Sequence, residues 1–299
     1  MRTACVLYPG EMGSAVARLL LEHGWGVVSF LEGRSQRTRD GAEAAGISAA
    51  PTLEAAVAGA DLVISLVPQS SALDTAAAFA RAAHGTDRRP PYLDANSISP
   101  DTMTAVAAVV ASSGAACVDG AFVGSAARLG GTTTLYVSGP EAQTVGSMLA
   151  EAFLVRVLGS HIGLASAFKL SFSGFNKGLV ALFLETVSAA DRLGQREQLM
   201  KCLQDFYPGT VETVERLLPS YPRHVGRRIE ELEQSLQWLR GIDEEGPMAS
   251  ATRSVFERLR DLDLPGDHPW ESDALVEEYC RRRSQRRPGS RPGGREPTT

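Results

Sequence analysis

The sequence predicts an α/β domain followed by an all-α domain, and two patterns along the chain carry this prediction. In the N-terminal half, short apolar or β-branched runs alternate with longer Ala- and Leu-rich segments, which is typical of a parallel sheet covered by helices. After about residue 163 the alternation stops, and only long segments with helical spacing follow. The length of 299 residues agrees, because single hydrophobic cores rarely grow beyond about 250–300 residues.

Each expected strand is a short apolar run, and each expected helix is a longer segment between two such runs. The strands are expected at residues 3–8, 26–31, 62–67, 91–94, 116–119, 133–137 and 154–158. Helices are expected at 12–23, 35–45, 53–58, 72–83 and 100–111, with a further segment at 140–152 that separates the last two strands. In the C-terminal half, helices are expected at 164–193, 195–206, 211–218, 223–239 and 248–262.

The first helix of the C-terminal half would contain about 30 residues and extend ~45 Å, which is too long for one small domain to surround. Such a helix commonly forms a spine shared between subunits, so we expect a homodimer formed through the helical domain. The domains are expected at residues 1–160 and 161–280. From residue 281 to 299 the chain is rich in Arg, Pro, Gly and Ser, which predicts a disordered basic tail.

The charge distribution argues against a nucleic-acid-binding function. The whole chain carries −5, and the last 19 residues hold seven arginines and one acid, so the preceding body carries −11. An acidic body repels phosphate backbones. Neither a long apolar run nor a signal sequence is recognisable, so we expect no membrane association and a cytoplasmic location. The four cysteines lack the spacing of zinc sites, and we expect no metal.

A glycine-rich turn joins the first expected strand to the first expected helix. A dinucleotide site needs a tight turn, backbone that can approach the pyrophosphate, and a small residue for close helix packing. Gly10 and Gly13 meet the last two requirements, with Glu11 and Met12 between them, whereas Tyr8 replaces the first glycine. The position at a strand-to-helix turn favours an NAD(P)-binding Rossmann domain. An ordinary turn and a methyltransferase site are the alternatives that the turn itself leaves open.

The end of the second strand contains both residue types that distinguish the two nicotinamide cofactors. Glu32 is of the type that binds the adenosine ribose diol of NAD, whereas Arg34 and Ser35 can bind a 2′-phosphate. We therefore expect NADP as the cofactor, with NAD possible. A solvated charged loop is the alternative for these side chains.

Four segments now occur in a characteristic order. They are Asp-Leu-Val-Ile-Ser-Leu-Val-Pro at 61–68, Leu-Asp-Ala-Asn-Ser-Ile-Ser-Pro at 93–100, Val-Asp-Gly-Ala-Phe-Val-Gly at 118–124, and the segment 163–169. Over residues 3–265 this succession resembles the β-hydroxyacid dehydrogenase superfamily, which includes 6-phosphogluconate and 3-hydroxyisobutyrate dehydrogenases. Some similar relatives have an uncharacterised helical C-terminal domain.

The resemblance implies roles for residues in the first three segments. Val67 and Pro68 would line the cofactor, and Asn96 and Ser97 would lie near the nicotinamide ribose and the substrate. A loop would bind the acid group of the substrate through its backbone amides. The residues of this loop are Asp119, Gly120, Ala121, Val123 and Gly124. The serine that is typical of the family in this loop is replaced by valine, so one hydroxyl contact is missing.

The family's catalytic lysine corresponds to Lys169. Hydride transfer to a carbonyl requires a positioned acid, and a partly buried lysine can release its proton whereas arginine cannot. Only three of the 30 basic residues are lysines, which favours a specific role over a surface lysine. The helper position holds Ser173, and Asn176 and Lys177 lie on the same helix face as possible substitutes. Lys177 is equally consistent with solvent exposure or with a substrate phosphate contact.

Together these features predict an NAD(P)-dependent oxidoreductase. It would transfer hydride between the nicotinamide and a carbon–oxygen centre of a small hydroxyacid-like, ketone or alcohol substrate, with Lys169 as general acid and base. Imine reduction on the same architecture and a cofactor-binding protein without catalysis are the two alternatives.

Overall fold

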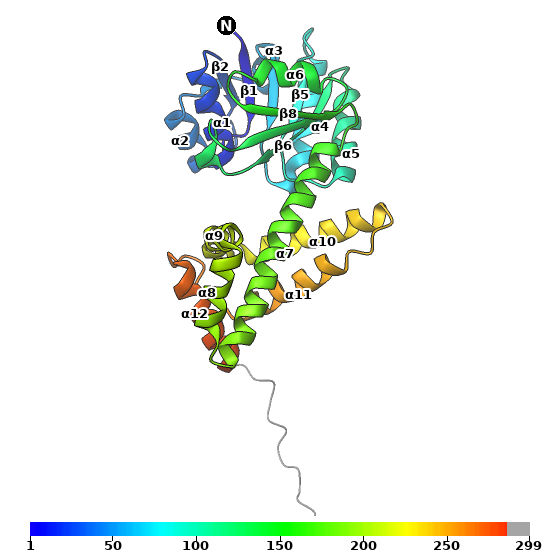
Figure 1. The fold of residues 1–299 in the computed structure, drawn as a ribbon. Coiled ribbons are helices and arrows are strands. Elements are labelled where there is room, and N and C mark those ends of the chain that lie inside the picture. Colours follow the sequence, from blue (N-terminus) through cyan, green and yellow to red (C-terminus); the bar gives the residue numbers. More distant parts are fainter. Residues whose placement is uncertain (286–299) are drawn as a thin grey trace, which may run out of the picture. The chain divides into compact units, whose positions relative to one another are not determined.

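The computed structural model describes residues 1–285 and divides the chain into two compact units (Figure 1). The first unit comprises Met1–Ser171, and the second begins at Phe172. The division falls inside helix α7 (Leu164–Arg192), whereas the sequence placed the domain boundary at residues 160–161, before this helix begins. Each unit is described separately below.

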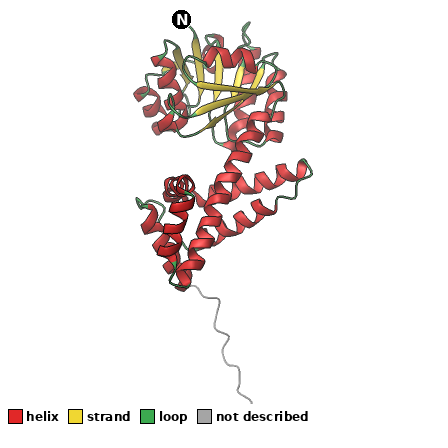
Figure 2. Ribbon diagram, in the orientation of Figure 1, coloured by secondary structure: helices red, strands yellow, loops and turns green. Residues whose placement is uncertain are grey.

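The first unit is built on a sheet, whose strands are yellow in Figure 2. The sheet has eight strands in the order β3-β2-β1-β4-β5-β6-β7-β8. Every neighbouring pair is parallel except β6 and β7. The strands are β1 (Thr3–Leu7), β2 (Gly26–Phe30), β3 (Ser48–Ala50), β4 (Leu62–Ser65), β5 (Tyr92–Asp94), β6 (Cys117–Val123), β7 (Thr134–Ser138) and β8 (Leu154–Gly159). Strand β3 was not expected, because its three residues are small and mostly exposed.

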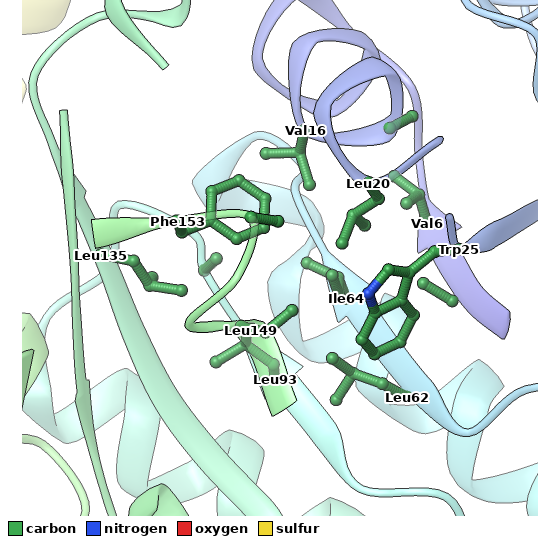
Figure 3. Close-up of a cluster of buried hydrophobic side chains, with 14 of the residues drawn as sticks. Val6, Val16, Leu20, Trp25, Leu62, Ile64, Leu93, Leu135, Leu149 and Phe153 are labelled. Atoms are coloured by element: carbon green, nitrogen blue, oxygen red, sulfur yellow. The ribbon is translucent and has the colours of Figure 1, made fainter. Parts of the chain in front are cut away.

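Helices cover both faces of this sheet, as its parallel strands require. Residues alternate along β1, so that Ala4 and Val6 contribute to one hydrophobic cluster while Cys5 and Leu7 contribute to the other. Figure 3 shows the first cluster, in which Trp25 packs with aliphatic side chains from the sheet and α1. The helices are α1 (Glu11–Glu22), α2 (Gln36–Ala44), α3 (Leu53–Ala58), α4 (Ala72–His84), α5 (Pro100–Ala111) and α6 (Ala142–Leu149), and single 3-10 turns lie at Gln69–Ser71 and Ala126–Arg128.

The strand order indicates the edge of the sheet at which a ligand would bind. From β1 the chain crosses to β2 and β3 on one side and then to β4 and β5 on the other, which makes β1 and β4 a topological switch point. Ligands of open α/β sheets bind beyond the carboxyl ends of the strands at such a point. The glycine-rich turn follows β1, and Val67 and Asn96 follow β4 and β5, so these segments meet at this edge.

The second unit is entirely helical. Beyond the shared α7 it contains α8 (Arg196–Phe206), α9 (Pro208–Leu217), α10 (Tyr221–Gly241), α11 (Pro247–Asp261) and α12 (Ser272–Gln285), with a 3-10 turn at Leu218–Ser220. Their apolar faces form one core around Leu184, Tyr221, Leu232, Phe256 and Tyr279. This confirms the predicted α/β domain followed by an all-α region. None of the helices described in residues 1–285 is long and apolar enough to cross a membrane.

The expected disordered tail was placed too early in the chain. Residues 281–285 form the last turn of α12 instead. The reason is local pairing: Glu278 binds both Arg281 and Arg282 at 2.6 Å, and Arg282 donates to the carbonyl of Leu262 at 2.7 Å. The remainder of the expected tail, residues 286–299, lies outside the described residues.

Candidate active site

The glycine-rich turn brings α1 unusually close to the end of β1. A Cβ atom at Gly13 would lie 2.8 Å from the carbonyl oxygen of Tyr8, so only glycine lets the helix begin here. The Gly10 amide donates to the same carbonyl at 2.8 Å. A Cβ atom at Gly10 would meet nothing within 4 Å, so the space beside it is open. Close packing at Gly13 and open backbone at Gly10 are what a pyrophosphate site needs.

Tyr8, at the place of the first glycine, contacts the end of β2. The guanidinium carbon of Arg34 lies 4.2 Å from the centre of the Tyr8 ring, which is a cation–π contact. Burial raises the pKa of Tyr8, and the charge of Arg34 opposes this rise. The contact places a cation beside the turn, where it could bind a phosphate on the adenosine ribose. The exposed Glu32 precedes it in the chain.

Ser35 caps a helix in addition to its predicted role in binding the cofactor. Its hydroxyl accepts a hydrogen bond from the Thr38 amide at 3.2 Å and so caps the start of α2. Ser35 is itself exposed, so the cap does not close it off from solvent.

Asn96 is almost fully buried, with 3% of its surface exposed, and its side chain joins two strands. Its Oδ1 atom accepts a hydrogen bond from the Val67 amide at 2.6 Å, and its Nδ2 atom donates to Ser65 at 3.0 Å and to Asp94 at 2.9 Å. These bonds fix the Val67–Pro68 turn relative to β5. The neighbouring Ser97 is exposed and has the freedom to contact a ligand.

Asp94 is a titratable group that the sequence reasoning did not select. It ends β5 and is 1% exposed. Burial raises its pKa to about 7; hydrogen bonds from Asn96 and the charge of Lys169 oppose the rise, while the charge of Asp119 adds to it. The signal available in the sequence was an acid at the end of a buried strand, between Leu93 and Ala95.

The segment around Asp119 was expected to be a substrate-binding loop; the structure places Cys117–Val123 in strand β6 instead, and the substrate-binding role stays a prediction. Strand β6 extends to Val123, and the antiparallel pairing with β7 matches Asp119 with Ser138 and Val123 with Thr134. The ladder with β7 occupies backbone groups that the loop would have offered to a substrate. Gly120 and Ala121 are buried within this strand, and Gly124 follows it.

The Asp119 carboxylate caps the start of α7. It accepts hydrogen bonds at 2.7–3.1 Å from the amides of Gly163, Ala165 and Ser166 and from the hydroxyls of Ser166 and Ser138. An anion is stabilised at a helix N-terminus, where the amides have no partners within the helix. Asp119 therefore positions α7 and has little capacity left for a substrate.

Gly124 has a steric role at the end of β6. Its φ angle is +136°, and a Cβ atom there would lie 2.2 Å from the Thr133 hydroxyl oxygen. That hydroxyl accepts a hydrogen bond from the Ser125 amide at 3.1 Å. Glycine at this position lets the chain leave the strand beside Thr133.

Lys169 lies in the first unit, one turn after the cap of α7. It is half-buried, and its charge acts on the carboxyl group of Asp94. The preceding residue, Phe168, packs on Tyr136 of β7 with 4.3 Å between the ring centres, which holds this turn of α7 against the sheet. The structure therefore brings together Lys169, Asp94 and Asn96 within one unit.

Ser173 and Lys177 belong to the second unit and contact each other. Lys177 is 3% exposed; it donates to the Ser173 hydroxyl and forms an ion pair with Glu231 of α10 at 2.9 Å. Burial lowers the pKa of Lys177, and Glu231 opposes this effect. The solvent-exposed alternative for Lys177 is therefore wrong. The half-buried Asn176 precedes it on α7.

Within residues 1–285, no group of three or more His, Cys, Asp or Glu side chains could hold a metal ion. The open backbone at Gly10 and the cation at Arg34 make this edge of the sheet suited to a dinucleotide.

Comparisons with known proteins identify both parts of the chain. Residues 7–151 match the NAD binding domain of 6-phosphogluconate dehydrogenase, and residues 190–259 match a domain of unknown function, DUF1932. An uncharacterized 28.5 kDa protein of Methanothermus fervidus is 26% identical over 254 residues, which cover 84% of this chain and 96% of that protein.

Solved structures share the fold over most of the chain. A conserved protein of unknown function, described as structurally similar to 3-hydroxyacid dehydrogenases, is 30% identical with a TM-score of 0.73, and the match covers 87% of this chain and 97% of that one. The 3-hydroxyisobutyrate dehydrogenase of Mycobacterium tuberculosis has a TM-score of 0.74 at 19% identity, with 93% and 98% covered. The chain therefore belongs to the β-hydroxyacid dehydrogenase superfamily of NAD(P)-dependent oxidoreductases, with an NAD(P)-binding domain of the 6-phosphogluconate dehydrogenase type and a DUF1932 helical domain.

Proposed function

We propose that the protein is an NADP-preferring oxidoreductase that transfers hydride to or from the carbon–oxygen centre of a small hydroxyacid-like, ketone or alcohol substrate. The observation that carries this proposal is Lys169, which is held by the capped start of α7 in the same unit as the glycine-rich turn, with its charge acting on Asp94. When bound, the nicotinamide supplies or accepts the hydride. The protein must then supply the proton and hold the substrate.

Lys169 is the general acid and base in this proposal. During reduction the substrate oxygen gains negative charge, and the Lys169 ammonium donates a proton from Nζ to that oxygen; during oxidation the neutral amine accepts the proton. Its half-buried position on a packed turn supports this role, because a fixed proton donor needs no reorganisation during the reaction.

Arg34 favours NADP over NAD. Its guanidinium is held over the Tyr8 ring, so less of its side-chain freedom is lost when it binds a phosphate. Ser35 and Arg37 follow it in the chain and are exposed. An adenosine 2′-phosphate is the group of NADP that a guanidinium at the end of the second strand binds.

The second unit supports assembly into a homodimer. Phe172, Phe175 and Leu182 of α7 are 45%, 70% and 59% exposed and recur at helical spacing. Large apolar side chains along one face of a helix are typical of an interface. The proposed partner is a second copy of the chain, and the remaining ligand is a small-molecule substrate.

The Lys169→Met variant tests the proposed activity. Turnover should fall by about 10²–10⁴ while NADPH affinity stays nearly the same, because methionine keeps the apolar volume and removes the proton. Lys201→Met is the matched control, since Lys201 is exposed on α8. Steady-state rates over a panel of ketones, hydroxyacids and imines give the readout.

Unchanged turnover in Lys169→Met would overturn the role of Lys169, and binding of NADPH without turnover on any substrate would indicate a non-catalytic protein. Turnover on imines alone would identify an imine reductase.

A further inference from the structure

We infer that Asp94 is a positioning residue of the proposed site: it holds Asn96, and through Asn96 the Val67–Pro68 turn, and it presents a charge to Lys169. This inference rests on the proposed function. It starts from an acid at the end of β5 that neither the sequence motifs nor the family comparison assigns a role.

The first step is the chain of hydrogen bonds around Asn96. Asp94 accepts a hydrogen bond from the backbone nitrogen of Asn96 at 3.0 Å and another from the side-chain Nδ2 of Asn96 at 2.9 Å. This orientation of the side chain leaves Oδ1 facing the Val67 amide, which donates to it at 2.6 Å. If Asp94 could not accept these bonds, the Asn96 side-chain nitrogen would keep only its bond to Ser65 within residues 1–285, and the link between β5 and the turn after β4 would be weakened.

The second step is the contrast between two neighbouring acids. Strand register places Asp94 between Ser65 of β4 and Asp119 of β6. Asp119 receives hydrogen bonds from the start of α7 and from Ser138, whereas the hydrogen bonds that Asp94 accepts within residues 1–285 come from Asn96. Two carboxylates side by side in a buried site disfavour simultaneous ionisation. Asp94 accepts fewer hydrogen bonds than Asp119, and its pKa is raised by burial and, to a smaller extent, by the charge of Asp119, so it holds a proton more readily than an exposed aspartate does.

The third step concerns the charges that face Asp94. Lys169 on α7 favours the ionised form, and Asp119 on β6 disfavours it. The buried Tyr92 and Cys117 are also within electrostatic reach, and burial raises the pKa of both, so they stay neutral near pH 7. An ionised Asp94 stabilises the protonated form of Lys169, which is the form that donates a proton during reduction. Protonation of Asp94 removes the negative charge that stabilises protonated Lys169. It also removes one acceptor for the hydrogen bonds that Asn96 donates.

The experiment compares three variants of the full chain. Asp94→Asn removes the charge and can place its own side-chain NH₂ donor opposite the side-chain Nδ2 donor of Asn96. The double variant Asp94→Asn with Asn96→Asp exchanges acid and amide, which restores hydrogen-bond complementarity but moves the charge by two residues. Asp61→Asn is the control: Asp61 also accepts from a backbone amide, that of Thr3 at 2.8 Å, but it lies at the amino end of β4.

We expect NADPH to bind roughly tenfold more weakly to Asp94→Asn, as expected for one unsatisfied buried polar group. The exchange variant should recover this affinity but not the wild-type dependence of turnover on pH. If Asp94 had only a structural role, NADPH affinity and the pH dependence of turnover would change together, or neither would change. Asp94→Asn with wild-type affinity and a wild-type pH profile would overturn the inference.

A second readout requires no activity. In ¹³C NMR of aspartate-labelled protein, the carboxyl signal that disappears in Asp94→Asn should titrate near pH 7 in the wild type and at higher pH in Lys169→Met, because the opposing charge is gone. Titration below pH 5, or at the same pH in both proteins, would contradict the inference. Failure of the wild type to bind NADPH would instead refute the proposed function, so the two failures are distinguishable.

Discussion

The hydroxyl of Ser166 donates to one carboxylate oxygen of Asp119 at 2.7 Å, and the amide of Ser166 donates to the other at 3.1 Å. A side chain from β6 thus provides the cap of a helix that begins about 45 residues later in the chain. Lys169 follows Ser166 on the same helix, so Asp119 determines where Lys169 lies relative to the sheet.

The Asp119→Ala variant should be strongly destabilised. Removal of the carboxylate leaves several buried amides of α7 without an acceptor, and we expect the free energy of unfolding to fall by about 3 kcal/mol or more. Ser138→Ala, which removes a single partner of the same carboxylate, should cost only about 1 kcal/mol. Urea unfolding followed by circular dichroism gives both values. Equal midpoints for Asp119→Ala and the wild type would show that the cap contributes nothing.

The sequence predicted the features that depend on local patterns. Short apolar runs that alternate with Ala- and Leu-rich segments revealed seven of the eight strands, and glycine spacing identified the turn at Gly10 and Gly13, whose steric basis lies in the approach to Tyr8. The α7 helix was expected within a residue of its bounds, because Ala- and Leu-rich helical spacing is continuous there.

Features that depend on contacts between distant residues could not be predicted. Asp119 looks like part of a polar turn until β7 pairs with it, and its capping of α7 requires the folded sheet. The burial of Lys177 depends on Glu231 of another helix. The pKa of Asp94 is raised mainly by burial within the folded sheet and, to a smaller extent, by Asp119, which the neighbouring strand places beside it.

Removal of Lys177 alone from the Lys177–Glu231 ion pair should destabilise the protein more than removal of both charged residues. Lys177→Met removes the cation and leaves the half-buried Glu231 with the more distant Arg227 at 3.4 Å. We expect the free energy of unfolding to fall by about 3 kcal/mol, since one partner of a buried pair is left behind. The double variant Lys177→Met with Glu231→Leu should be close to wild type in stability, because both charges are gone.

The control for this pair is Arg253 with Glu257, which are 3.4 Å apart and both partly exposed. Breaking such a pair should change stability by less than about 1 kcal/mol. Chemical denaturation of the wild type, Lys177→Met, Glu231→Leu and the double variant provides a double-mutant cycle for the buried pair. If the double variant were no more stable than Lys177→Met alone, the pair would not explain the burial of Lys177.

Arg34→Ala should reduce cofactor selectivity. We expect NADPH to bind about 10- to 100-fold more weakly while NADH binding changes little, because only NADPH has the 2′-phosphate. Arg2→Ala is a matched control, since Arg2 also lies over an aromatic ring, that of Trp25 at 5.8 Å, but at the other end of β1. Fluorescence titration with each cofactor measures the effect. Equal losses for NADPH and NADH would contradict a role for Arg34 in phosphate recognition.

Charges on the exposed face of α7 should prevent dimer formation. In Phe175→Asp with Leu182→Asp, two carboxylates replace apolar side chains that are exposed in the single chain, so folding should be preserved while association is lost. Ile242→Asp changes a side chain of similar exposure beyond the end of α10 and should leave association intact. Light scattering after size-exclusion chromatography reports the mass. A wild-type mass equal to that of one chain would refute the proposed dimer.

Asp94 should make stability fall as pH rises. Its pKa is raised from 3.8 to about 7 in the native state, so between these values the native protein holds a proton that the unfolded chain has released. The stabilising contribution is complete below about pH 4 and is lost as pH rises through 7, with a slope of up to about 1.4 kcal/mol per pH unit. Asp94→Asn lacks this group, so its free energy of unfolding should decline less between pH 5 and pH 8.

Asp61 has a lowered pKa, and its contribution is lost only as pH falls below about 4, so Asp61→Asn should keep the wild-type slope in this range. Urea unfolding at half-unit steps measures the slopes, and parallel lines for Asp94→Asn and the wild type would show that Asp94 is already ionised at pH 5.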